Sequence, residues 1–199
     1  MPHYFDSSPT VPSRPSTVDV VVDGRAFALT TDRGVFAAGA VDAGTRVLLD
    51  AMRPPPTGDL LDLGCGYGLI SVALAVRAPS ALVWAVDVNE RAVALTAANA
   101  ASAGLANVRA VTPDAVPCGV HFAGLWSNPP IRIGKAALHA LLTTWLDRLA
   151  PGAAASLVVH KNLGADSLAR WLSEQGWPTT KESSRQGYRI LQALARSDP

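Results

Sequence analysis

From residue 59 onward, short apolar segments alternate with longer segments of helical character, and this alternation constrains the fold more than any other feature. Strands are predicted at 59–64, 81–87, 107–111, 121–127 and 153–160, and helices at 68–77, 90–103, 135–149 and 165–175. The first two strands are apolar at nearly every position, as in strands buried on both faces of a parallel sheet. The pattern predicts a doubly wound α/β fold, in which ligands bind at the carboxyl ends of the strands.

The N-terminal part of the chain has a different character. Residues 1–16 are rich in Pro and Ser and are predicted to form an irregular arm, followed by a single domain over 17–199. Within that domain, the segments 17–23 and 25–31 alternate apolar and polar residues on either side of an Asp-Gly dipeptide. Asp-Gly suits the positive φ angles of a two-residue turn, so these segments predict a β-hairpin.

Two further segments complete the expected architecture. Residues 33–52 begin as a loop and are predicted to become a helix near Asp42. The tail, 179–196, is predicted to form two strands joined through Ser183 to Gly187. With the five earlier strands, these give a seven-stranded, mainly parallel sheet accompanied by an N-terminal hairpin.

Composition limits the possible partners and compartments. The 199 residues are 49% hydrophobic and 17% charged with a net charge of +1, so a nucleic-acid partner requires a local basic surface. Cys65 and Cys118 form no metal-binding or disulfide pattern, which fits a reducing cytosol. No apolar run approaches the roughly 20 residues that span a bilayer, and the first 16 residues lack the apolar core of a signal peptide. A cytoplasmic protein without a membrane or metal partner is expected.

The first predicted strand leads into a glycine-rich loop, 62-DLGCGYG-68. Its glycines allow a sharp turn and close approach of a ligand to the backbone. A dinucleotide fingerprint needs G-x-G-x-x-G, and its third glycine position is occupied here by Leu69. Asp62 would repel a pyrophosphate but suits a cationic amino group. The loop therefore favours a zwitterionic ligand, with a tight turn that binds nothing as the alternative.

Acidic residues follow the next two predicted strands. Asp87, in 86-VDVNE-90, is suited to accept hydrogen bonds from both hydroxyls of a ribose. Its alternative role is the N-cap of the following helix, which Asn89 would fill equally well. Asp114, in 112-TPDA-115, is a candidate partner for an adenine amino group and is also a plausible turn residue.

The series DLGCGYG, AVDVNE, TPDA and SNPP resembles the class I S-adenosylmethionine-dependent methyltransferases, with all four motifs in order over residues 58–131. The resemblance implies S-adenosyl-L-methionine as the cofactor, with the glycine loop beside its methionine part, the second-strand acid on the ribose and the next acid near the adenine. The implied cofactor-binding residues are Asp62, Gly64, Cys65, Gly66, Gly68, Asp87, Val88, Asp114 and Asn128.

The stretch 127-SNPPIRIGK-135 carries the expected chemistry. In the family that it resembles, Asn-Pro-Pro after the fourth strand marks enzymes that methylate a planar nitrogen. Pro129 and Pro130 stiffen the backbone, so the Asn128 side-chain oxygen and the Pro129 carbonyl can both accept hydrogen bonds from one amino group. This would position the nitrogen for methyl transfer without a general base. A turn that merely ends the strand is the alternative.

The remaining substrate candidates surround this motif. Where many such enzymes carry an aromatic residue after the prolines, this chain has Ile131, which packs on a flat base with less stacking. Phe36 is the candidate for a compensating aromatic ring, with a core position as its alternative. Arg132, Lys135 and Lys161 are candidate contacts to phosphates around an extruded base, although a surface cation is usually just solvated.

Nearly the whole chain resembles small bacterial relatives of the 16S-type ribosomal RNA guanine-N2 methyltransferases, through segments such as 31–49, 128–142 and 160–172. This implies methyl transfer to an exocyclic amino group of RNA, most readily guanine N2 of ribosomal RNA or of a ribosomal subunit. Protein glutamine and adenine N6 remain alternative acceptors. Small-molecule methylation and a cofactor-binding RNA or assembly protein with little turnover are further alternatives.

Overall fold

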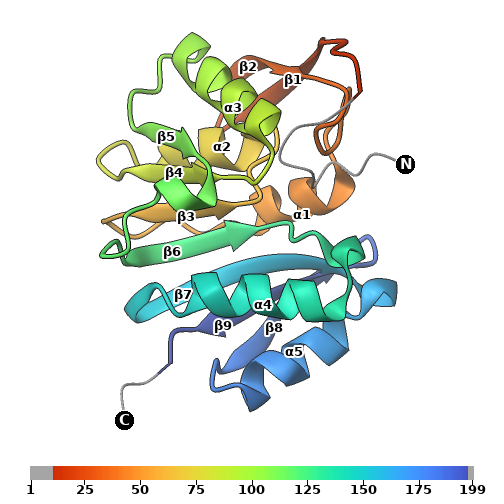
Figure 1. Cartoon of the computed structure of the whole chain (residues 1–199), viewed down its shortest axis with the longest axis vertical. Helices are drawn as coiled ribbons and strands as arrows, with labels where there is room; N and C mark the ends of the chain where they lie inside the picture. The colour runs from red at the N-terminus through yellow and green to blue at the C-terminus, as the bar shows by residue number, and fades with distance from the viewer. Residues whose placement is uncertain (1–10, 197–199) are drawn as a thin grey trace.

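The computed structural model describes residues 11–196, and Figure 1 shows a central twisted sheet with helices on both faces. Within that range the sheet has seven strands in the order β5-β4-β3-β6-β7-β9-β8. Strands β3 to β7 pair in parallel, whereas β9 is antiparallel to both of its neighbours. The strands are β3 (Leu60–Leu63), β4 (Val83–Val86), β5 (Val108–Val111), β6 (Phe122–Ser127), β7 (Leu149–His160), β8 (Thr179–Arg185) and β9 (Tyr188–Leu194). The predicted mainly parallel, seven-stranded α/β fold is confirmed.

The predicted N-terminal hairpin is also confirmed, and it forms a separate two-stranded sheet. Strands β1 (Ser16–Val22) and β2 (Arg25–Thr31) are joined by Asp23 and Gly24, whose φ angles of 48° and 79° are both positive, as the tight hairpin turn requires. Asn99 holds the hairpin to the main body, because its side chain bonds both the N–H and the C=O of Thr30 at 2.8 Å.

Five α-helices cover the two faces of the sheet in the described part of the chain. They are α1 (Ala43–Ala51), α2 (Leu69–Arg77), α3 (Glu90–Ser102), α4 (Lys135–Leu146) and α5 (Ala165–Glu174). Apolar residues of α1 and α2 pack on one face and those of α4 and α5 on the other, while α3 packs beside α2 with the hairpin. None of these helices is long and apolar enough to cross a bilayer.

Short 3-10 turns follow three of the parallel strands at their carboxyl ends. They are η1 (Pro113–Ala115) after β5, η2 (Ile131–Ile133) after β6 and η3 (Lys161–Leu163) after β7. The chain therefore does not pass directly from these strands into a long helix. The turns η1, η2 and η3 therefore lie at the same edge of the sheet. In folds of this kind, ligands bind in a crevice outside the carboxyl ends of the parallel strands.

Several predicted boundaries differ from the structure by a few residues, and two of them have a clear cause. Helix α4 ends at Leu146 rather than near residue 149, because Leu149 already opens β7 and pairs with Phe122. In the tail, β8 continues to Arg185, and the turn is only Gln186 and Gly187, with φ angles of 51° and 81°. The predicted irregular arm lies mostly in residues 1–10, outside the described residues.

A carboxyl group lies inside the core of the sheet. Asp62, in β3, is fully buried, and its Oδ2 accepts a hydrogen bond of 2.6 Å from the Ser71 hydroxyl of α2. Within the described residues its Oδ1 has no hydrogen-bond partner. Burial raises the pKa of Asp62 to about 7, against the opposing effect of the Ser71 hydrogen bond.

The buried Asp62 predicts a pH-dependent stability. Between about pH 4 and pH 7 the folded protein keeps a proton that the unfolded chain has lost, so the free energy of unfolding should fall as the pH rises through this window, by roughly 4 kcal/mol at most. The variant Asp62→Asn keeps the shape but cannot ionise, and should lack this decline in urea unfolding series from pH 4 to pH 8. The control Asp19→Asn removes an exposed carboxylate of β1 and should retain it. Parallel pH profiles for wild type and Asp62→Asn would contradict the assignment.

Candidate active site

A cavity of about 680 Å³ lies at the carboxyl ends of β3 and β6, within the size range of small-molecule sites. The order of the sheet explains its position. From β3 the chain adds β4 and β5 on one side, and β6 then begins the other side. Such a reversal separates the loops that leave the two central strands and opens a crevice between them. Residues after β3, β4, β6 and β7 therefore meet around one space.

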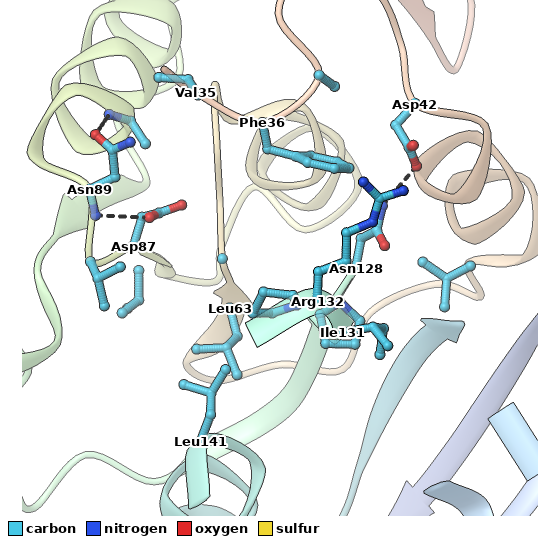
Figure 2. A pocket seen from close by; sticks show the side chains of 18 of the residues that line it. Val35, Phe36, Asp42, Leu63, Asp87, Asn89, Asn128, Ile131, Arg132 and Leu141 are labelled. Carbon is cyan, nitrogen blue, oxygen red and sulfur yellow. Dashed lines mark hydrogen bonds between the residues drawn. The ribbon is translucent and has the colours of Figure 1, made fainter. Parts of the chain in front are cut away.

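The cavity wall is built from the loop before α1, from the ends of these strands and the turns η1, η2 and η3, and from parts of α3, α4 and β9. The lining residues are Val35, Phe36, Ala37, Asp42, Leu63, Gly64, Val86, Asp87, Val88, Asn89, Ala92, Pro113, Asn128, Pro129, Pro130, Ile131, Arg132, Leu141, Trp145, Val158, His160, Asn162, Leu163 and Tyr188. Figure 2 shows Asp87 and Asn89 at one end, Asn128 and Asp42 at the other, and Phe36 between them.

The glycines of the loop after β3 have different surroundings. Gly64 has a φ of +76°, and a Cβ added to it would meet nothing within 4 Å, so its backbone is open to a ligand in the cavity. Gly68 has a φ of +92°, and an added Cβ would lie 2.9 Å from the Thr96 side chain of α3. Gly64 thus leaves room for a ligand, whereas Gly68 allows the close packing of α3 on the loop.

The acid after β4, Asp87, lines the cavity. Asp87 is half-buried, and its Oδ2 accepts a hydrogen bond of 2.9 Å from the N–H of Gly66 in the glycine loop. The N-cap of α3 is Asn89, which accepts hydrogen bonds from Arg91 and Ala92, so Asp87 is not needed as the cap. Burial raises the pKa of Asp87, and hydrogen bonds from backbone N–H groups oppose this effect.

The amide of Asn128 is held in one orientation. Its Nδ2 donates to Asp42 Oδ2 at 2.8 Å and to Thr45 Oγ1 at 3.0 Å. A carboxylate only accepts hydrogen bonds, so the NH2 end must face Asp42, and the Asn128 oxygen is turned the other way. Asn128 therefore presents a fixed acceptor at the end of the cavity opposite Asp87 (Figure 2).

The two prolines form a tight turn after this amide. Pro130 has φ −74° and ψ 72°, close to an inverse γ-turn, and the Pro129 carbonyl accepts a hydrogen bond of 2.8 Å from the N–H of Ile131. One of the two lone pairs of that carbonyl is thereby used within the chain, and one stays available for a ligand. The Pro-Pro pair thus adds a second acceptor beside Asn128.

Phe36 reaches the cavity because its loop is tied to α3. The Asn89 side chain donates to the Gly34 carbonyl at 2.7 Å, and an Arg91 guanidinium N–H donates to the Arg33 carbonyl at 2.6 Å. Figure 2 shows the Phe36 ring projecting into the space above Ile131. The half-buried Phe36 and Ile131 therefore offer apolar surface from two sides of the cavity.

The structure gathers most, but not all, of the sequence-predicted residues. The cavity is lined by Phe36, Gly64, Asp87, Val88, Asn128, Pro129, Pro130, Ile131 and Arg132, and a small adjoining pocket by Cys65 and Gly66. Outside both lie Asp62, Gly68, Asp114, Lys135 and Lys161. Asp62 is buried behind the loop, whereas Asp114 and the two lysines are exposed. Pro113 lines the cavity where Asp114 was expected.

Several cavity residues are not among the site residues predicted from the sequence. Asp42 was recognised only as a helix start, and the proximity of Asn128 to Asp42 and Thr45 depends on tertiary structure. His160 ends β7 and Tyr188 opens β9, and their rings meet edge to face at 5.0 Å between centroids. The one signal for these two residues in the sequence was their position, because His160 ends a predicted strand and Tyr188 begins one.

Comparisons with known proteins agree with this geometry. A family model described as "Methyltransferase small domain" matches residues 26–192. The uncharacterized protein YbxB of Bacillus subtilis is 35% identical over 96% of this chain and 97% of its own length. The ribosomal RNA small subunit methyltransferase C of Pseudomonas fluorescens is 32% identical over 80% of this chain and 48% of its own length.

Solved structures include a similar fold with a ligand. The 16S rRNA N2 methyltransferase of Thermus thermophilus, solved in complex with AdoMet and guanosine, matches with a TM-score of 0.80 and 25% identity. The match covers 94% of this chain and 52% of that one. The chain thus spans about half the length of the named ribosomal RNA methyltransferases that it matches. The predicted relationship to the class I S-adenosylmethionine-dependent methyltransferases is confirmed, and the chain belongs to the methyltransferase small domain family.

Proposed function

We propose that the chain transfers a methyl group from S-adenosyl-L-methionine to an exocyclic amino group of RNA, most specifically guanine N2 of ribosomal RNA. One observation carries the proposal: Asp42 and Thr45 hold the NH2 end of the Asn128 amide, which leaves the oxygen of this cavity-lining residue as an oriented acceptor. An oriented acceptor beside a large cavity suits a substrate that offers an amino group. The relatives named for ribosomal RNA methylation support the choice of RNA.

The described residues fit the proposed cofactor. The open backbone of Gly64 gives room beside the loop, and the half-buried Asp87 offers oxygens for ribose hydroxyls. Val88 and Pro113 give apolar surface beside Asp87 for an adenine ring. The unpartnered Oδ1 of Asp62 lies just behind the loop, where a cationic amino group would be favoured. The cofactor would supply a methyl group activated by a positive sulfur.

The chain's own contribution to transfer is orientation. The Asn128 oxygen and the free lone pair of the Pro129 carbonyl would accept the two hydrogens of the amino group, which favours a pyramidal nitrogen with its lone pair directed at the methyl carbon. Transfer would form a nitrogen–carbon bond as the carbon–sulfur bond of the cofactor breaks, and the electron pair of the broken bond would stay on sulfur. The nitrogen then loses its extra proton to solvent. No general base is needed before transfer.

Binding of RNA would rest on a local surface rather than on overall charge. Arg132 lines the cavity, and the exposed Lys135 and Lys161 lie on the segments after β6 and β7. None of the three forms an ion pair with a described residue. These side chains are suited to phosphates flanking a base that has left its stack.

Label transfer from methyl-tritiated S-adenosyl-L-methionine tests the function. Small ribosomal subunits, large subunits, total tRNA and protein extract serve as acceptors. We expect label in small-subunit RNA, recovered as N2-methylguanosine on digestion. Asn128→Ala should lower kcat about 100- to 1,000-fold while S-adenosylhomocysteine still binds. The control Asn162→Ala removes another amide from the cavity wall and should keep most of kcat. Label in protein alone, or equal loss of binding and transfer in Asn128→Ala, would overturn the proposal.

The cofactor position has its own test in a pair of glycines. Gly64 and Gly104 have φ angles of +76° and +70°, and an added Cβ meets nothing within 4 Å at either, so alanine strains both backbones by about 1–2 kcal/mol. Only Gly64 lines the cavity. Calorimetric titration with S-adenosylhomocysteine should show at least tenfold weaker binding for Gly64→Ala and little change for Gly104→Ala. Equal affinities for the two variants would exclude the cofactor from the face of Gly64.

A further inference from the structure

The two carboxylate oxygens of Asp42 differ in their hydrogen bonding. Its Oδ2 accepts hydrogen bonds from the N–H of Thr45 at 2.9 Å and from Asn128 Nδ2 at 2.8 Å. For Oδ1, the structure of residues 11–196 shows no hydrogen bond, and no cation lies within 4.0 Å of either oxygen. The side chain is half-buried and lines the cavity. An N-cap needs only one acceptor, so capping α1 leaves the second oxygen unexplained.

The free oxygen belongs to a group of acceptors at one end of the cavity. Asn128 and Asp42 are joined through the amide NH2, and both residues line the cavity. The Pro129 carbonyl adds the third acceptor of this group. At this end the cavity therefore offers acceptors for an amino group and, next to it, a negatively charged acceptor for another donor.

Among planar amino compounds, guanine matches this group of acceptors. Its Watson–Crick edge carries the N2 amino group directly beside the N1–H, so the N1 hydrogen and one N2 hydrogen point the same way, while the second N2 hydrogen points toward the N3 side. In adenine and cytosine the amino group adjoins a ring nitrogen that only accepts, and in a glutamine side chain it adjoins a carbonyl oxygen. A carboxylate that faces any of these acceptors would be repelled by the lone pairs of the acceptor.

We propose that Asp42 is the residue that specifies guanine: its Oδ1 accepts the N1–H of the base, while its Oδ2 orients the Asn128 amide that receives the N2 amino group. This inference rests on the proposed function, because it assigns the base that the same cavity would take. It makes Asp42 both a specificity determinant and a positioning residue for Asn128.

Two variants separate these roles. Asp42→Asn has the same shape and still caps the helix. When the side-chain oxygen of the variant keeps the hydrogen bonds to Thr45 and Asn128, its NH2 group occupies the position of the free Asp42 oxygen. A donor then replaces the acceptor at that position. Thr45→Val keeps the shape and the carboxylate but removes one acceptor from the Asn128 amide. Both are compared with wild type in thermal melting and in S-adenosylhomocysteine binding, which report on folding.

The experiment measures methyl transfer to two nucleosides, guanosine and 2-aminopurine riboside. Both carry the 2-amino group, but the N1 of 2-aminopurine is an acceptor without hydrogen. Wild type should favour guanosine at least tenfold in kcat/KM, a ratio that Asp42→Asn should reduce at least tenfold or invert. Thr45→Val should lower kcat for both nucleosides and leave the ratio unchanged. The ratio is independent of the folded fraction, so a purely structural role of Asp42 would not alter it.

The outcomes distinguish this inference from the proposed function. An unchanged ratio in Asp42→Asn would overturn the role of Asp42 and leave guanine-N2 methylation standing. If wild type transfers no methyl group to either nucleoside, the inference that this cavity recognises the edge of a single base is overturned. Label in small-subunit RNA would still support the proposed function. Absence of label in both nucleosides and subunits would overturn the proposed function itself.

Discussion

The position of the site depends on the pairing of β3 in the centre of the sheet. This four-residue strand is buried along its whole length and pairs in parallel with β4 on one side and β6 on the other. The chain leaves β3 at its carboxyl end through a glycine loop and returns to the sheet on opposite sides of it. The loops after β3 and β6 are thereby directed apart, and the cavity is the space between them. Gly64, Asp87 and Asn128 meet there because each ends a strand of this arrangement.

The polar groups of the site are oriented by hydrogen bonds within the chain. Asp87 is tied to the N–H of Gly66, Asn128 to Asp42 and Thr45, and the loop of Phe36 to Asn89. Such preorganisation reduces the ordering cost of binding and of transfer. The buried Asp62 adds a carboxyl group whose ionisation is opposed by its surroundings.

Sequence reasoning succeeded where a local pattern carries the physical cause. Asp23-Gly24 predicted the hairpin because its φ angles are a property of two residues, and DLGCGYG predicted the loop because it follows a strand buried on both faces. It failed at the end of α4, where pairing of Leu149 with Phe122, rather than helix propensity, decides the boundary. The sequence places three charged residues shortly after strands that end at the ligand-binding edge, namely Asp114, Lys135 and Lys161. In the structure these residues lie in or just after the turns η1, η2 and η3, and their side chains are exposed and outside the cavity wall.

By itself the sequence determined the order of the elements, the parallel sheet and the strand ends that carry chemistry, because periodicity, glycine and proline act over a few residues. Only the tertiary structure decided what faces Asn128. Asp42 and Thr45 are 86 and 83 residues away from it along the chain, and packing of α1 against the sheet brings them into hydrogen-bonding distance. The direction of the Asn128 amide, and the free oxygen of Asp42 beside it, follow from that long-range contact, which no local pattern encodes.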